Sequence, residues 1–230
     1  GSGFFPAPPA LAFPAFVVGI GLNDSYGTAA KFFFFLLPYV FLVAAQDTVR
    51  SDIESGALEN VLFVGGRFRG FLKAKCAVVA AASGGYALLL FGLFAAWGLA
   101  VSAFRLAFLA QFGLALLAGL YYVALAAVLS HFLKGGSNVL AILLAQTASV
   151  LALLFTVSAR TGLLDHAATG HFPGLAPKLV FGGLVALLPN VIVSGRLLPF
   201  AAEVLAGLGL ALFVEARLMR RLELGYRRGS

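Results

Sequence analysis

Charged residues are scarce in this 230-residue chain: 11% of its residues are charged and 61% are hydrophobic, and its mean hydropathy is +1.01. A water-soluble domain is typically about 25% charged and about half apolar, because polar surface must cover its core. This composition excludes a soluble globular fold and predicts an integral membrane protein. The 27 glycines suit helices that pack closely within lipid.

Disulfides and nucleotide-binding motifs are also lacking. The single cysteine, Cys76, excludes an intramolecular disulfide. P-loop enzymes hold the phosphates of ATP with the pattern GxxxxGK[ST]. The two Gly-Gly pairs beside a basic residue, at 65–67 and 134–136, lack its Gly-Lys-Ser/Thr core. We therefore expect this chain not to be an enzyme and to hold no cofactor of its own.

Apolar runs long enough to cross the hydrocarbon core of a bilayer, about 20 residues each, recur along the sequence. They predict an all-α integral membrane protein, a single domain over 1–230 with six transmembrane helices near 9–22, 28–46, 76–100, 106–130, 137–159 and 197–216. A seventh run, 179–195, is short and contains Gly182-Gly183 and Pro189-Asn190. We expect a re-entrant or external helical hairpin there, before the sixth span.

The basic residues predict the orientation, because cytoplasmic loops are enriched in Lys and Arg. With six spans and both termini cytoplasmic, eleven of the 16 basic residues lie inside, whereas seven spans would place the C-terminal arginines outside. We expect a multi-pass protein of the plasma (inner) membrane, in which basic residues contact lipid headgroups rather than nucleic acid. The eleven are Arg50, Arg67, Arg69, Lys73, Lys75, Lys134, Arg217, Arg220, Arg221, Arg227 and Arg228.

The polar stretch between the second and third predicted spans carries most of the functional signal. Its apolar residues, at 53, 57, 58, 61 and 62, recur at helical spacing and predict a short amphipathic helix broken near Gly56. Asp52, Glu54 and Glu59 lie off that apolar face. The face either docks in a groove of a soluble protein partner or lies on lipid headgroups. Repulsion between these acids and anionic lipid favours the protein partner.

This loop and the order of the spans resemble the permease subunits of type-2 ATP-binding-cassette (ABC) exporters. In that family the loop between spans two and three reads as an acid, two residues, Gly-Thr-Leu-Glu, apolar residues, a proline and a lysine that opens span three. Here Gly-Ala-Leu-Glu at 56–59 follows Asp52 and Glu54, and Lys73 or Lys75 precedes the third span. The threonine is replaced by alanine and the proline by Gly65. Residues 1–8 do not contain the basic amphipathic segment that precedes span one in the family.

The resemblance covers essentially the whole chain and implies a permease that works as a homo- or heterodimer with a pair of ABC ATPase subunits, which bind ATP and Mg²⁺. The loop would couple closure of the ATPases to movement of the spans. The hairpin before the sixth span would form an external gate. The ATPase-coupling residues implied are Asp52, Glu54, Gly56, Leu58, Glu59 and Leu62.

Polar residues within the spans are candidates for a substrate pathway. They include Gln111, Tyr121, Gln146 and Ser149. Hydrogen bonding between helices also explains these polar residues, and we favour this interpretation. The spacing of Asp165, His166 and His171 in the sequence does not match a metal-binding motif, so these residues do not predict a metal site.

Three other functions remain open from the residues. One is a haem-exporter-type permease, the second is a scaffold without transport activity, and the third is a lipid-modifying enzyme. The enzyme would need a cluster of intramembrane Asp, Glu or His residues, and the predicted spans offer little beyond Glu203.

Overall fold

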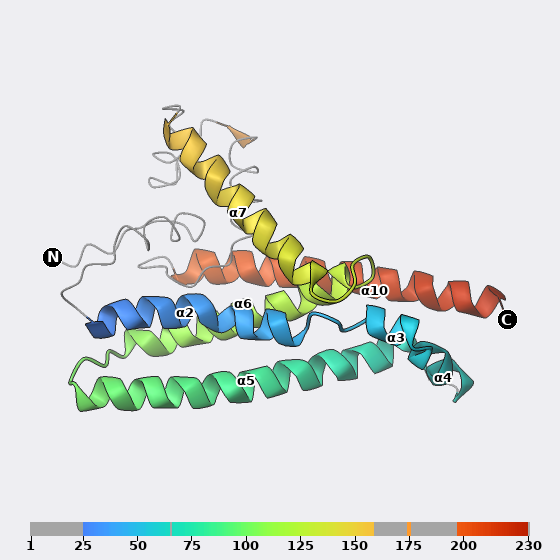
Figure 1. The fold of residues 1–230 in the computed structure, drawn as a ribbon, viewed down its shortest axis with the longest axis horizontal. Helices are drawn as coiled ribbons and strands as arrows, with labels where there is room; N and C mark the ends of the chain where they lie inside the picture. The colour runs from blue at the N-terminus through green and yellow to red at the C-terminus, as the bar shows by residue number, and fades with distance from the viewer. Residues whose placement is uncertain (1–24, 65, 159–173, 176–196, 230) are drawn as a thin grey trace.

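The computed structural model describes residues 25–64, 66–158, 174–175 and 197–229, and this part of the chain is predominantly helical and contains no strand (Figure 1). Three helices are long and apolar enough to cross a membrane: α2 (Ser25–Ala44), α5 (Phe68–Ala100) and α6 (Ala107–Leu129). Two further long helices are α7 (Ser137–Ser158) and α10 (Leu197–Gly229). Short helices α3 (Arg50–Glu54) and α4 (Ala57–Phe63) connect α2 to α5. The protein is therefore a helical, membrane-embedded chain.

The five long helices occupy five of the six ranges expected for spans, while 9–22 and the hairpin at 179–195 lie outside the described residues. Two helices are longer than expected. α5 begins at Phe68 instead of 76, and α10 continues to Gly229 instead of ending at 216. The added turns are amphipathic: Phe68, Leu72 and Met219 are buried, whereas the basic Arg69 is exposed. Phe68, Leu72 and Met219 pack against Leu58, and because polar residues interrupt these turns a search for apolar runs does not detect them.

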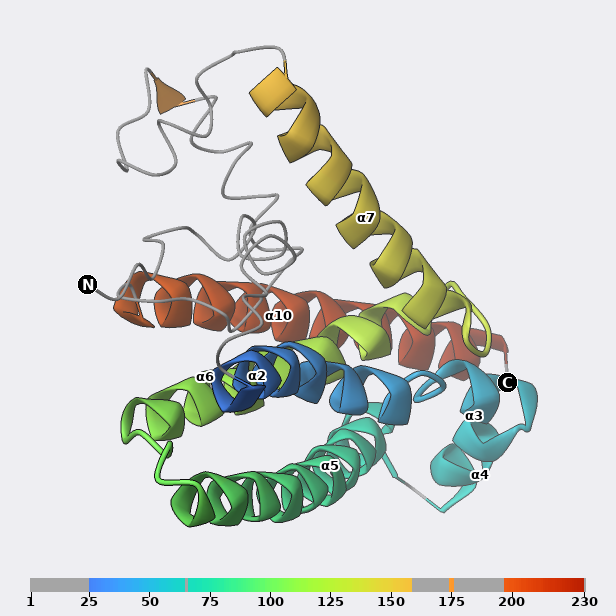
Figure 2. The same ribbon diagram turned by 60° about the vertical axis from the view of Figure 1, so that its left-hand side comes forward.

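Helix α6 lies at the centre of the bundle. It packs against α2 and α10, and α5 packs against α2 and α6 (Figure 2). Small residues on α6, including Ala115 and Ala118, are fully buried and allow close approach of its neighbours. At Gly119 a Cβ atom would collide with the ring of Phe41 on α2, so glycine is required there. α2, α6 and α10 run in one direction and α5 runs in the other (Figure 1).

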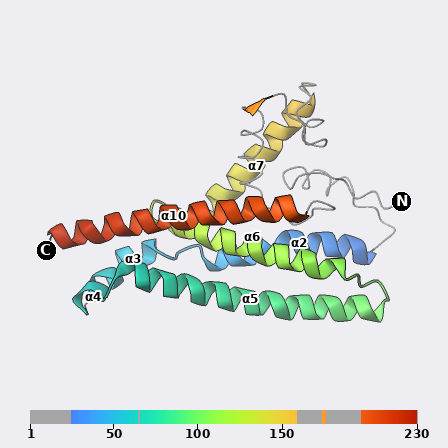
Figure 3. The same ribbon diagram turned by 180° about the vertical axis from the view of Figure 1, so that it is seen from behind.

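The two ends of the bundle differ in chemistry. At one end, the aromatic end, the rings of Tyr26, Phe94, Trp97 and Phe108 contact one another, and Tyr26 Oη donates a hydrogen bond to the carbonyl of Phe94 at 3.2 Å. The opposite end, the polar end, gathers α3, α4, the start of α5, residues 130–136 and the last turns of α10 (Figure 3). From the polar end α7 leaves the bundle at an angle (Figure 2).

Candidate functional site

The segment between α2 and α5 forms two short helices because of Gly56. This residue has a φ of +72°, in the left-handed region that side chains disfavour, and α4 begins directly after it. The amides of Glu59 and Asn60 donate to the carbonyl of Gly56 and so start the new helix. The predicted break near Gly56 is confirmed.

The apolar face of α3 and α4 packs against the protein's own helices. Val49 and Leu58 are about 1% exposed and form a cluster with Phe68 and Leu72 of α5 and Met219 of α10, which we call the basal cluster. Ile53, Val61 and Leu62 pack at its edge. We expected this face to dock on a partner or on lipid. The structure buries Leu58 of this face against the added turns of α5 and α10 and leaves Ile53, Val61 and Leu62 partly exposed, so docking on a partner stays a prediction.

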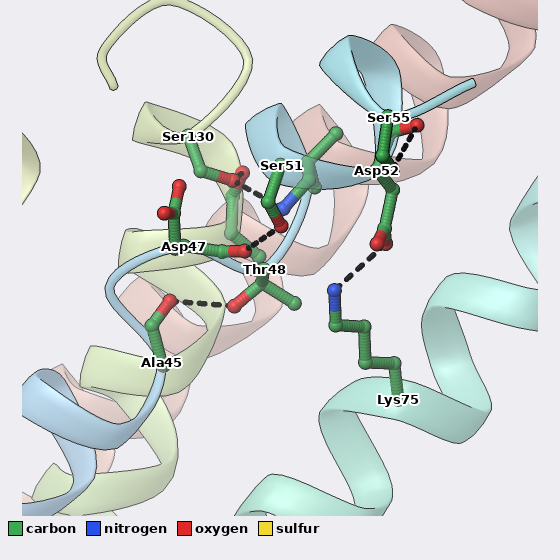
Figure 4. Close-up of polar contacts among 10 residues, drawn as sticks. Ala45, Asp47, Thr48, Ser51, Asp52, Ser55, Lys75 and Ser130 are labelled. Atoms are coloured by element: carbon green, nitrogen blue, oxygen red, sulfur yellow. Dashed lines mark hydrogen bonds and ion pairs between the residues drawn. The ribbon is translucent and has the colours of Figure 1, made fainter. Parts of the chain in front are cut away.

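Ion pairs fix α3 to two other parts of the polar end. Asp52 Oδ2 lies 2.7 Å from Lys75 Nζ on α5 (Figure 4). Glu54 Oε2 lies 2.7 Å from Lys134 Nζ, in the connection between α6 and α7, and Glu54 Oε1 lies 3.0 Å from Arg50 Nε. The hydrogen bond from Lys134, followed by that from Arg50, holds the pKa of the Glu54 carboxyl below its usual value. Asp52 and Glu54, two of the acids expected to face a partner, thus form ion pairs within the chain.

Hydrogen bonds attach the start of α3 to the end of α6. The amide of Val49 donates to Ser130 Oγ at 3.1 Å, and Ser130 Oγ donates to the carbonyl of Ala127 at 2.8 Å. Thr48 and Ser51 donate to the carbonyls of Ala45 and Asp47 (Figure 4). The side chain of Asn138, at the start of α7, donates to the carbonyl of Gln46. These hydrogen bonds and the Asp52–Lys75 pair connect α3 and the residues before it to α5, to the end of α6 and to the base of α7.

The far side of α4 is exposed. Glu59, Asn60, Phe63 and Val64 form what we call the α4 tip, in which Phe63 is 86% and Val64 is 84% exposed. Within the described residues the side chain of Glu59 has no hydrogen bond or ion pair. The tip belongs to the polar end, where Arg67, Arg69, Lys73 and Lys75 lie at or just before the first turns of α5.

Two of the candidate pathway residues, Tyr121 and Gln146, both contact Tyr122. Gln146 is buried; its Oε1 accepts from Tyr39 Oη at 2.8 Å and its Nε2 donates to Tyr122 Oη, which ties α7 to α2 and α6. Tyr121 packs against Gly207 of α10. Gln111 is half-buried, and the side chain of Ser149 lies outside the described residues. Gln146 thus makes the hydrogen bonds between helices, and a substrate role for these residues stays a prediction.

One buried polar pair was missed by sequence reasoning. His131, just after α6, lies 2.9 Å from Glu215 of α10, with its side chain 7% exposed. An isolated carboxylate inside the apolar run 208–216 was the available signal. Asp165, His166 and His171 lie outside the described residues, and within these no group of three His, Cys, Asp or Glu side chains is placed to hold a metal.

No family model, curated protein or solved structure matches this chain.

Proposed function

We propose that this chain is the transmembrane permease subunit of an ABC exporter, which moves a substrate across the membrane with ATP hydrolysed by separate ATPase subunits. A pair of such chains would stand above a pair of ATPases. The observation that supports this most is the two-sided character of α3 and α4. One side packs against α5 and α10, and the α4 tip presents the exposed side chains of Phe63, Val64 and Glu59 at the polar end.

The polar end is the cytoplasmic end in this proposal. Most of the described basic residues belong to this end: Arg67, Arg69, Lys73, Lys75, Lys134 and the arginines of the last turns of α10. Arg105, in contrast, follows α5 at the aromatic end. Basic residues are retained on the cytoplasmic side during insertion, so this asymmetry favours a cytoplasmic α4 tip. A soluble ATPase would meet the tip there.

The α4 tip has the composition of a protein-binding site. Aromatic side chains are enriched at protein interfaces and often supply much of the binding energy, and a charge at the rim helps to fix the orientation. Phe63 and Val64 supply the apolar anchor and Glu59 supplies the charge. A matching groove on the ATPase would be apolar with a basic rim.

The internal contacts would transmit the movement. A displacement of the tip passes through Leu58 to α5 and α10, and through the Asp52–Lys75 and Glu54–Lys134 pairs to α5 and the α6–α7 connection. Packed helices change between discrete arrangements rather than deforming continuously, so the ATPases can bias one of two packings of the spans. In this proposal the contacts that transmit movement within the chain are made by Asp52, Glu54, Leu58 and Leu62. Glu59 contacts the ATPase.

Co-purification from the native membrane tests the proposal. The chain carrying an affinity tag is isolated in mild detergent, and its partners are identified by mass spectrometry. We expect a P-loop ATPase, which is lost from the F63A/V64A and E59R variants but retained with L99A, an exposed control at the aromatic end. A scaffold or lipid-modifying enzyme would give no ATPase with the unaltered chain, and that result would reject the proposal.

A further inference from the structure

The His131–Glu215 pair is the most deeply buried ion pair in the part of the chain that the structure describes. His131 Nε2 and Glu215 Oε1 are 2.9 Å apart, and Glu215 is 8% exposed. The second carboxylate oxygen, Glu215 Oε2, is buried and has no hydrogen-bond partner among the described residues. A buried carboxylate that lacks donors is costly, so the charge on this pair matters to the packing of α6 against α10.

The pair is neutral when it holds one titratable proton, either as imidazolium with carboxylate or as imidazole with carboxylic acid. Removing that proton leaves an uncompensated negative charge in a site with little water. Adding a second proton leaves an uncompensated positive charge. Either change weakens the contact, because a buried charge without a partner is unfavourable. The two protonation steps belong to the pair and not to either residue alone.

The pair is mechanically linked to the basal cluster. Glu215 and Met219 are one helical turn apart and therefore share a face of α10. Met219 is 1% exposed and packs in the basal cluster with Leu58 of α4 and Phe68 of α5. Loosening of α10 from His131 therefore loosens the support beneath α3 and α4.

Other titratable groups in the described part of the chain lie at the same end of the bundle as the pair. On α5, the Cys76 thiol lies within electrostatic range of Glu215. The ammonium group of the adjacent Lys75 forms an ion pair with Asp52. In the connection after α2, also at the polar end, the carboxylate oxygen Oδ1 of Asp47 is buried and has no hydrogen-bond partner among the described residues. Along α10 itself, Arg217, Arg220 and Arg221 are exposed, and Arg217 lies over the ring of Phe213.

We propose that His131 and Glu215 form a proton-dependent latch that holds the last turns of α10 against α6 and thereby seats α3 and α4 on the bundle. Because the charge of an imidazole–carboxylate pair depends on the number of protons it holds, the contact responds to pH. The consequence for coupling rests on the proposed transport function; the latch itself does not.

Thermal unfolding of the full chain in detergent, from pH 5 to 9, tests the latch without any ATPase. The melting midpoint of the unaltered chain is expected to pass through a maximum, where the pair holds one proton. In E215Q the amide accepts a hydrogen bond from neutral His131. Its midpoint should therefore approach that of the unaltered chain at acid pH, where both hold an imidazolium beside a neutral group, and rise above it at alkaline pH, where only the unaltered chain holds an unpaired carboxylate.

Two controls isolate the pair. In H131Q/E215Q the contribution of the pair disappears, so the maximum should flatten, whereas E59Q, at an exposed carboxylate, should keep the profile of the unaltered chain. All measurements are repeated with C76A, to remove the thiol near Glu215. Parallel profiles for the unaltered chain and H131Q/E215Q would overturn the latch. A latch confirmed in a chain that recruits no ATPase would instead reject the proposed function alone.

Discussion

Leu58 offers the sharpest test of how α3 and α4 are held. It is 1% exposed within the basal cluster, so L58A removes a buried side chain and leaves a cavity. Such substitutions cost about 2–5 kcal/mol. We expect the lower part of this range, about 3 kcal/mol, because the cluster lies at the periphery and can partly collapse.

The loss should appear as local opening rather than as global unfolding, because the large aromatic and aliphatic core around α6 is separate from the basal cluster. About 1.4 kcal/mol changes an equilibrium tenfold, so amide exchange in 49–64 should accelerate about 100-fold while α6 keeps its protection. Hydrogen–deuterium exchange with mass spectrometry in nanodiscs measures this. The matched control is F63A, on the same helix but 86% exposed, which should leave protection unchanged. Equal acceleration in both variants would refute the two-sided description of this segment.

Other contacts give further predictions. K75D should lower the free energy of unfolding by about 1 kcal/mol by breaking the pair with Asp52, and D52K/K75D should recover part of this loss in denaturant titrations. G56A places a side chain at a left-handed position that has open space, so strain alone should cost about 1 kcal/mol, and G56N should cost less. Because the pKa of Glu54 is lowered, its contacts should be intact above the usual range of a glutamate and be lost as pH falls through the lowered value. Faster exchange near α3 at acid pH, already present at neutral pH in E54Q, would show this. Q146L should destabilise the chain by about 1 kcal/mol, seen as a lower melting midpoint in detergent.

The helices of this protein could be predicted from sequence because lipid imposes a simple rule. An apolar run of sufficient length must form a helix to satisfy its backbone hydrogen bonds, and α2, α6 and α7 begin and end within a few residues of the expected ranges. The break at Gly56 was equally accessible, since glycine favours the conformation found there.

The candidate site was harder to predict from the sequence, because it depends on residues that are distant from one another in the sequence. The helical spacing of Leu58 and Leu62 revealed an apolar face but not its occupant, which is the protein's own α5 and α10. In the same way, Asp52 is separated by 23 residues from Lys75. No local pattern reveals that partnership. The pair of His131 and Glu215 likewise forms only when α6 and α10 pack together.

The proposed function requires the α4 tip to contact an ATPase at the cytoplasmic face. Photo-crosslinking from position 63 in native membranes, with a photoreactive amino acid replacing Phe63, tests it most directly. The account predicts a crosslink to a P-loop ATPase subunit, while the same probe at position 99 reacts with lipid or other membrane components. Crosslinks from position 63 to lipid alone, with none to an ATPase, would contradict it.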